Sequence, residues 1–414
     1  MNKHLTGLTI AAFAVIPSLF AAGGSEADKP QGFRPLRNHH LTIKPYVALS
    51  YTYDSNIDTT DKSTGDSIFC IQPGADFEWK GDDRWSLVGS LWYRRNAYCK
   101  YANEMGENSF GESLAWKWAT SKQNEKGWSL TLAEKYRYSD QADALGSGDG
   151  RGIWRDREAF DISGIFERRF SERLHADVRG QYNWLDYKND TGKYAPLYGW
   201  QSYSLGAEAG YAFTSLTDML VAGGYSHYTQ PGGHGYHHYS NDSKTWTVQA
   251  GLGTRATERI TYRALMGASW LEYGGHSGSD CSWTYSLSAN WKISRQLQAS
   301  LLGNSYYQPS ERTRGQALKV YSLSGGLSYL TLGDKMTLTA NVAWRYEDTC
   351  YNDRYLSYGN NFDEDILSVR LGATYTINRW VSVFATFTWK DEWCDRRSYD
   401  YDRFRGTIGM RFHY

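Results

Sequence analysis

The sequence predicts an all-β fold, a transmembrane antiparallel up-and-down β-barrel of about 18 strands, with about 16 as the alternative. Three observations lead to this prediction. Apolar and polar side chains alternate along most of the chain, short and long connections follow one another in turn, and aromatic residues collect near both kinds of connection. A barrel in lipid has all three features, because each strand meets hydrocarbon on one face and water on the other.

Composition argues against membrane helices. The 414 residues are 41% hydrophobic, 16% aromatic and 22% charged, with a mean hydropathy of -0.62. Beyond the amino-terminal segment, no run approaches the roughly 20 apolar residues that a membrane helix needs. A chain of this kind enters a membrane only as a closed barrel. The formal net charge is zero, so we expect no nucleic acid as a partner.

The amino-terminal residues have the pattern of a secretory signal peptide. Lys3 gives a basic start, residues 5–20 are mostly apolar, and small residues follow at 21–25. Pro17 and the shortness of the apolar run argue against the alternative, an anchoring helix. Cleavage could follow Ala22, Gly23 or Ala27, and the sequence does not choose among them. We divide the chain into a signal peptide (1–22), a periplasmic amino-terminal segment (23–40) and an outer-membrane β-barrel (41–414).

The last segment shows the alternation most plainly. In residues 402–414, one face carries apolar residues and the other carries polar or small ones: Ile408, Met410, Phe412 and Tyr414 against Arg405, Thr407, Gly409, Arg411 and His413. A half-buried soluble strand also alternates, but it would not repeat the pattern over most of a chain. The predicted strands span residues 41–53, 67–79, 84–95, 107–118, 127–138, 157–168, 173–184, 200–213, 218–228, 243–254, 259–270, 283–293, 297–307, 319–330, 335–347, 365–377, 381–391 and 402–414.

The connections give an independent test, because outer-membrane barrels alternate short periplasmic turns with long external loops. We predict short turns at residues 80–84, 168–173, 214–218, 254–259, 293–296 and 377–380. We predict long polar loops at residues 54–66, 139–155, 185–199, 229–242, 271–282 and 347–364. An even number of strands then places both termini on the periplasmic side.

Aromatic residues fit the same orientation, since barrels concentrate them at the two membrane interfaces. Close to the predicted short turns lie Trp79, Trp85, Trp118, Trp128, Phe213, Trp291, Trp380 and Tyr414. Close to the predicted long loops lie Tyr51, Tyr93, Tyr138, Trp184, Tyr225, Trp270, Tyr307 and Trp389. A soluble β-sandwich of the same length would have neither set.

The first strand ends in a short motif, Tyr53-Asp54-Ser55-Asn56, at its exit into the first long loop. On this motif the chain resembles the β-barrel porin 2 family. The carboxy-terminal Phe412 and Tyr414 look like the signal that the barrel-assembly machinery reads. The resemblance implies a barrel over the whole mature chain and, since some relatives are associated with exopolysaccharide, a glycan role. Asp54 and Asn56 are also residue types that cap turns by bonding nearby backbone.

A barrel of this size can hold an aqueous channel, so passage is the default function. The alternation predicts that the lumen is lined by several basic residues, namely Arg94, Lys117, Lys135, Arg137, Arg179, Arg263, Arg345, Arg370 and Arg405. A ring of positive charge would favour anionic solutes. The alternative is that mixed charges only keep the wall wet. Aromatic lumen candidates Tyr46, Trp92 and Tyr306 could stack on sugar rings or pack against an inward loop.

The predicted loops carry weaker signals. His234, His237 and His238 are close enough in sequence to bind zinc or copper, but no carboxylate or cysteine stands at ligand spacing. The acidic loops lack an EF-hand pattern. His238 and Ser240 form the nearest Ser–His pair, with no orienting residue. We therefore predict no metal, no cofactor and no enzymatic activity.

Five cysteines fall in or near the predicted external loops, where an exported protein can form disulfides. The odd number leaves at least one thiol unpaired within the chain. Connectivity does not follow from the sequence, and the candidate pairs are Cys70 with Cys99 and Cys350 with Cys394.

The function predicted from these features is an outer-membrane, porin-like channel for small hydrophilic solutes or saccharides. The alternative is a receptor, adhesin or exopolysaccharide-export accessory barrel without an open channel. Expected partners are outer-membrane lipid and lipopolysaccharide, the barrel-assembly machinery, and a glycan or small-solute ligand. The oligomeric state stays open.

Overall fold

The computed structural model describes residues 36–37, 40–57, 64–82, 84–100, 106–120, 127–142, 155–187, 199–230, 242–254, 259–274, 279–309, 317–350, 363–394 and 400–414. Within these ranges the regular secondary structure consists of β-strands, joined by turns. None of the described residues belongs to a helix that is long and apolar enough to cross a membrane.

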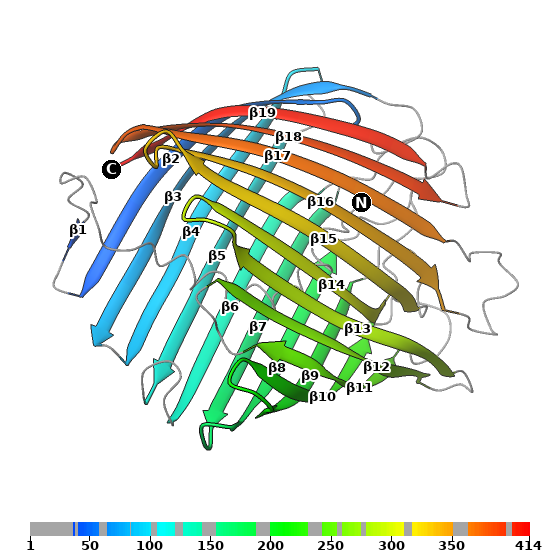
Figure 1. The fold of residues 1–414 in the computed structure, drawn as a ribbon. Helices are drawn as coiled ribbons and strands as arrows, with labels where there is room; N and C mark the ends of the chain where they lie inside the picture. The colour runs from blue at the N-terminus through cyan, green and yellow to red at the C-terminus, as the bar shows by residue number, and fades with distance from the viewer. Residues whose placement is uncertain are drawn as a thin grey trace, which may run out of the picture.

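The strands form one antiparallel sheet that closes on itself (Figure 1). A two-residue strand, β1 (Leu36–Arg37), pairs with the start of β2. The strands of the barrel are β2 (Leu41–Asp54), β3 (Asp66–Asp82), β4 (Trp85–Tyr98), β5 (Gly106–Ala119), β6 (Gly127–Ala142), β7 (Arg155–Arg169), β8 (Leu174–Tyr187), β9 (Trp200–Ala212), β10 (Thr217–Thr229), β11 (Ser243–Thr254), β12 (Ile260–Tyr273), β13 (Ser279–Lys292), β14 (Leu297–Pro309), β15 (Ala317–Thr331), β16 (Met336–Thr349), β17 (Glu364–Asn378), β18 (Val381–Cys394) and β19 (Tyr401–His413).

Each strand from β2 to β19 pairs with the next in sequence, and β19 pairs with β2 to complete the circle. The prediction of a closed barrel of 18 antiparallel strands is confirmed. The closing ladder runs from Arg405 opposite Asp54 to His413 opposite Tyr46. The first and last barrel strands therefore begin and end at the same edge of the barrel.

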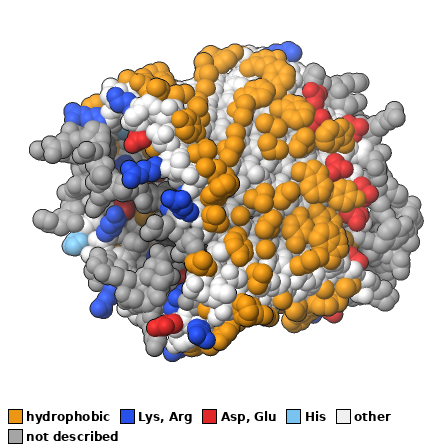
Figure 2. Space-filling model, in the orientation of Figure 1, with side chains coloured by type: hydrophobic (Ala, Val, Ile, Leu, Met, Phe, Trp, Pro, Cys, Tyr) orange, Lys and Arg blue, Asp and Glu red, His pale blue; other side chains and the backbone are white. Residues whose placement is uncertain are grey.

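The outer face carries the apolar residues that the alternation predicted. Ile408 is 62% exposed and Met266 is 63% exposed. Every barrel strand from β2 to β19 has at least one large apolar side chain that is exposed. Figure 2 shows these side chains as a broad zone between two edges, with basic groups toward one edge and acidic groups along the other. An exposed apolar zone of this extent is stable only against lipid or another apolar surface.

The predicted and observed strand ends agree to within a few residues at the edge of the short turns. At the other edge the strands run further than predicted, to Tyr187 in β8, Tyr273 in β12 and Cys394 in β18, and β13 begins at Ser279 rather than at 283. These extensions rise beyond the apolar zone. Apolar side chains there, such as Tyr187 and Tyr273, are buried in clusters with neighbouring strands, so the alternation between lipid-facing and water-facing residues no longer marks the strand.

Four of the short turns share one local device. Ser171, Thr214, Ser294 and Asn378 each accept hydrogen bonds from the backbone N–H groups two and three residues later, at 2.8–3.2 Å. Short polar side chains satisfy the backbone of tight turns in this way. The β15–β16 turn differs, because Leu332, Gly333 and Asp334 all have positive φ angles.

Candidate solute pathway through the barrel

All nine predicted pore-lining residues lie on the face opposite the apolar zone. Arg405, for example, lies opposite Asp54 in the closing ladder, while its neighbour Phe404 is exposed on the outer face. Arg94 donates a hydrogen bond to Gln72 of the neighbouring strand at 3.2 Å. The register of the ladders therefore brings these basic groups to the inner wall.

Carboxylates accompany several of these basic groups. Arg179 lies 2.5 Å from Asp177, and Arg345 lies 2.6 Å from Glu347. Lys135 stands opposite Asp161 across the β6–β7 ladder. Residues two apart on a strand share a face. A basic and an acidic residue at that spacing can therefore be predicted to pair, which a list of basic residues alone does not show. The wall is better described as mixed charge than as a positive ring.

One ion pair spans several strands. Arg263 of β12 donates to Glu208 of β9 at 2.5 and 2.8 Å and to Ser286 of β13 at 2.7 Å. Flat strands would place β9 and β12 about 14 Å apart. The pair therefore requires the wall to bend sharply around β10 and β11, and this bend could not be predicted from strand periodicity.

A cavity of about 760 Å³ lies against this bent part of the wall. Its polar lining is rich in hydroxyl and amide groups, including Gln181, Asn183, Ser202, Thr247, Gln249 and Asn304. Some of these groups bond to one another, as Gln181 does to Asn183 at 2.9 Å. The same lining includes both partners of the Arg179–Asp177 and Arg263–Glu208 pairs. Hydroxyl and amide groups therefore supply much of the hydrogen-bonding capacity that the lining offers to a molecule in the cavity.

Of the three predicted aromatic lumen residues, Tyr306 lines this cavity. Tyr46 lies under the guanidinium of Arg411, 4.3 Å from its ring centre. Trp92 lies beside Arg94 at 5.2 Å. Tyr228, which the sequence analysis did not select, also lines the cavity. The lining also includes four further tyrosines, namely Tyr225, Tyr262, Tyr285 and Tyr307.

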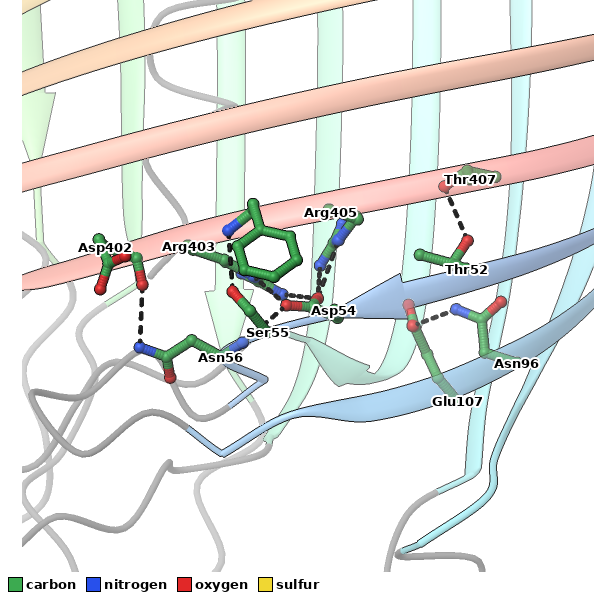
Figure 3. A network of polar contacts seen from close by, with 11 residues as sticks. Thr52, Asp54, Ser55, Asn56, Asn96, Glu107, Asp402, Arg403, Arg405 and Thr407 are labelled. Atoms are coloured by element: carbon green, nitrogen blue, oxygen red, sulfur yellow. Dashed lines mark hydrogen bonds and ion pairs between the residues drawn. The ribbon is translucent and has the colours of Figure 1, made fainter.

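The Tyr53-Asp54-Ser55-Asn56 motif lies where the barrel closes (Figure 3). Asp54 is fully buried, and its carboxylate accepts hydrogen bonds from Arg403 at 2.5 and 2.8 Å and from Arg405 at 2.9 Å. It also caps the local turn by accepting from the backbone of Asn56 at 3.2 Å. The turn-capping interpretation is thus correct but incomplete, because the strongest contacts go to the last strand.

The next two residues of the motif reach the same strand. Ser55 exchanges hydrogen bonds with the backbone of Phe404 at 2.9 and 3.0 Å, and the Asn56 amide donates to the carbonyl of Asp402 at 3.2 Å. The motif therefore fixes the register between β2 and β19, and its contacts point to closure of the sheet rather than to a ligand.

Phe412 and Tyr414 are exposed on the outer face at the edge where the chain ends. The backbone of Tyr414 donates to the carbonyl of Pro45 at 3.0 Å. The terminal aromatic side chains are thus presented outward. Recognition of Phe412 and Tyr414 by the barrel-assembly machinery stays a prediction.

In the structure all five cysteines are free thiols, and neither candidate pair lies within disulfide distance. The backbone of Cys99 bonds to that of Ser67, and Ser67 precedes Cys70 by three residues, or about 10 Å along a strand. Cys350 follows β16 and Cys394 ends β18, so β17 separates them. A disulfide needs Cα atoms closer than about 7 Å.

Thiol labelling tests whether the cysteines are free. We expect all five cysteines to be alkylated in the denatured protein without a reductant. In the folded protein, Cys99 and Cys281 should react first, because they are exposed. Cys350 should react last, because burial raises the pKa of its thiol and little reactive thiolate forms. A disulfide-linked peptide in the mass spectrum of unreduced protein would contradict this prediction.

Several sequence predictions lie outside the described residues. These are the signal peptide, the histidine cluster His234, His237 and His238, the hydroxyl of Ser240, and the acidic loop residues Asp58, Asp61 and Asp353. Over the described ranges, no group of three or more His, Cys, Asp or Glu side chains is placed to hold a metal ion. His227, near the histidine cluster, hydrogen-bonds to Tyr203 across the β9–β10 ladder.

No family model matches the chain, and no curated protein matches it. Among solved structures, the siderophore receptor PirA from Acinetobacter baumannii is similar at a TM-score of 0.45 and 9% identity, over 90% of this chain and 80% of that one. A loop-deletion mutant of OmpT, an outer membrane protein of Vibrio cholerae, is similar at a TM-score of 0.37 and 13% identity, over 91% and 100%. Similarity at this level says nothing about ligands.

The molecule's own features are more informative. The sheet closes without a free edge, its outer face is apolar between two charged edges, and its inner face is polar. Those are the requirements for strands that cross a bilayer. The protein is an outer-membrane β-barrel.

Proposed function

We propose that the protein is a passive channel for small hydrophilic solutes, and that neutral saccharides are the class it passes best. The observation that carries this proposal is the chemistry of the inner wall. Its charges lie in pairs, such as Arg179 with Asp177 and Arg263 with Glu208, while its hydroxyl and amide groups line the cavity.

Paired charges explain the preference for neutral solutes. A lone arginine would attract anions, but a carboxylate at 2.5 Å cancels most of its field beyond a few ångströms. Hydroxyl and amide groups replace the water that a sugar loses on entry. The rings of Tyr228 and Tyr306 offer apolar faces against which sugar rings can stack.

In this proposal the edge that holds the short turns and both ends of the barrel faces the periplasm. Short turns on that side and long loops outside are the usual arrangement of such barrels. Contact with lipopolysaccharide on the outer side, and recognition of the terminal aromatics during assembly, belong to the same proposal.

Bilayer recordings and liposome swelling test the proposed function. Purified protein should give stepwise conductance with weak ion preference, and proteoliposomes should swell in neutral sugars faster than protein-free liposomes. A receptor or adhesin without an open channel would stay silent in both measurements, and that result would overturn the proposal.

The charge pairs make a sharper prediction. Glu208→Gln leaves Arg263 uncompensated and should shift the reversal potential toward anions. Arg263→Gln should shift it toward cations by the opposite change. The double variant should return to weak preference, with a several-fold change in the permeability ratio for each single variant. Equal selectivity in all four proteins would show that these groups do not face the permeating solute.

A further inference from the structure

The ladder between β13 and β14 stops halfway. Its pairs run from Lys292 opposite Gln298 to Ser286 opposite Asn304 and end there, although β13 continues to Ser279 and β14 to Pro309. On their other sides the same two strands stay paired nearly to their ends, with β12 and β15. The halves of β13 and β14 on the side of the long loops, residues 279–285 and 305–309, therefore meet along a seam without a backbone ladder.

At the seam the wall overlaps itself. Ser305 and Tyr307 of β14 and Lys319 of β15 belong by alternation to the outer face, yet all three are buried. Their partners are inward-facing residues of the neighbouring strands. Ser305 bonds to Thr284 at 3.2 Å, Tyr307 donates to Asp280 at 2.9 Å, and Lys319 donates to Ser269 at 3.0 Å. The ends of β14 and β15 that carry Ser305, Tyr307 and Lys319 thus lie on the inner side of β12 and β13.

Lys319 is unusual among these residues. It is 2% exposed, and its amino group lies 4.2 Å from the ring centre of Tyr307. Over the described part of the chain, no carboxylate lies within ion-pair distance of this amino group, although Lys135, Lys390 and several arginines of the barrel have carboxylate neighbours. The nearest carboxylate, that of Asp280, is bonded to Tyr307 instead, so the amino group keeps unused capacity to bind an anion.

Each hydrogen bond between β13 and β14 at the seam has a side chain as at least one partner. Ser269, Thr284, Ser305 and Tyr307, which make the seam contacts, also line the cavity. On the outside, Trp283 packs on Tyr321 with ring centres 5.4 Å apart. Tyr285 reaches over the seam and donates to the backbone of Ser322 at 2.9 Å. Opening the seam would break side-chain contacts and no ladder.

We propose that this seam is a lateral passage for amphipathic molecules with an anionic head group and a single hydrocarbon chain. Lys319 binds the carboxylate or phosphate head, and the chain extends between Trp283 and Tyr321 into the outer half of the bilayer. Backbone without a ladder partner is tolerated where it is buried in protein or lines a cavity, and the seam meets both conditions. The passage is separate from the axial route proposed above for neutral solutes.

A reversible cross-link tests the passage. In a variant with all five native cysteines replaced by serine, Thr284→Cys with Ser305→Cys puts two sulfurs where oxygens now lie 3.2 Å apart. The matched control is Ser90→Cys with Ser113→Cys, whose oxygens lie 2.8 Å apart across the intact β4–β5 ladder. Mass spectrometry of unreduced peptides would verify that each pair forms.

The readout is the labelling of the lumen by a photoreactive twelve-carbon fatty acid dissolved in the proteoliposome membrane. We expect adducts on inward residues such as Gln181 and Asn183 to fall several-fold when the seam is oxidised and to return on reduction, while the control pair changes nothing. Single-channel conductance should be the same in both states, which separates this test from that of the axial channel. Unchanged lumen labelling with a verified seam disulfide would overturn the proposal.

The role of Lys319 is tested by head-group preference. Lys319→Met should lower labelling by the fatty acid several-fold and leave labelling by the matching fatty alcohol unchanged, whereas Lys319→Arg should retain both. If Lys319→Met fails to fold, the comparison of Lys319→Arg with Lys319→Gln replaces it. Equal labelling by the acid and the alcohol in the unmodified protein would refute an anionic head group.

Discussion

Replacing Asp54 with asparagine is expected to lower the free energy of unfolding by about 3–5 kcal/mol, the usual result of breaking a buried ion pair from one side. The change keeps the shape of the side chain but removes its charge. Arg403 and Arg405 would then lie 2.5–2.9 Å from a neutral amide, and the Arg403 side chain is only 11% exposed. The contacts that are lost join β2 to β19, the two strands whose ladder closes the barrel.

Denaturant titration of the protein refolded in lipid, followed by tryptophan fluorescence, would measure this loss. Asp402→Asn is the matched control, because Asp402 lies on the same strand and gives the network only its backbone carbonyl. The double variant Asp54→Asn with Arg403→Gln should recover part of the loss, since the buried guanidinium is removed as well. A change below about 1 kcal/mol, the range of an exposed pair, would mean that the contacts contribute little to closure.

Adding one methyl group at Gly251 should have the second largest effect. A Cβ built on Gly251 would lie 1.9 Å from the backbone oxygen of Ala264, and one on Gly267 would lie 1.9 Å from that of Val248. Backbone cannot move aside as a side-chain tip can. We expect Gly251→Ala to lower the free energy of unfolding by about 1–3 kcal/mol, as overpacking does. Glycine within strands often marks such sharp bends in a barrel wall.

The matched control is Gly224→Ala, on the neighbouring β10. A Cβ there would meet its nearest atom at 3.8 Å, an ordinary contact, so stability should stay nearly unchanged. The bend also brings Arg263 to Glu208. Gly251→Ala should therefore disturb ion selectivity as well as stability, whereas Gly224→Ala should disturb neither. Equal unfolding curves for Gly251→Ala and the unmodified protein would show that the wall relaxes freely at β11 and β12.

The alternation in the sequence was sufficient for the fold, because strands in lipid face two solvents and each residue reports which one it meets. It placed Arg179, Arg263 and Arg405 on the inner wall for this reason. It could not give the outer ends of β8, β12 and β18, where Tyr187, Tyr273 and Cys394 are buried against protein and not exposed to lipid.

Contacts that depend on the curvature of the wall could not be predicted from the sequence either. Arg263 meets Glu208 only because β10 and β11 bend, and Asp54 meets Arg403 only through closure of the ring. At the seam, Ser305 and Tyr307 keep the outward alternation although protein covers them. A pattern of residue types describes polarity, and it does not distinguish lipid from a second layer of the same sheet.

The order of the strands has a consequence for how the barrel forms. Each neighbouring pair from β2–β3 to β18–β19 joins consecutive strands, whereas Thr52 and Thr407, which hydrogen-bond across the last ladder, are 355 residues apart. Joining ends so distant costs roughly 2–3 kcal/mol more in chain entropy than forming a local hairpin. Hairpins can form one after another as the polypeptide emerges, but the ring can shut only after β19 is complete. Truncation of the final strand should therefore trap an open sheet with most of its hairpins already formed.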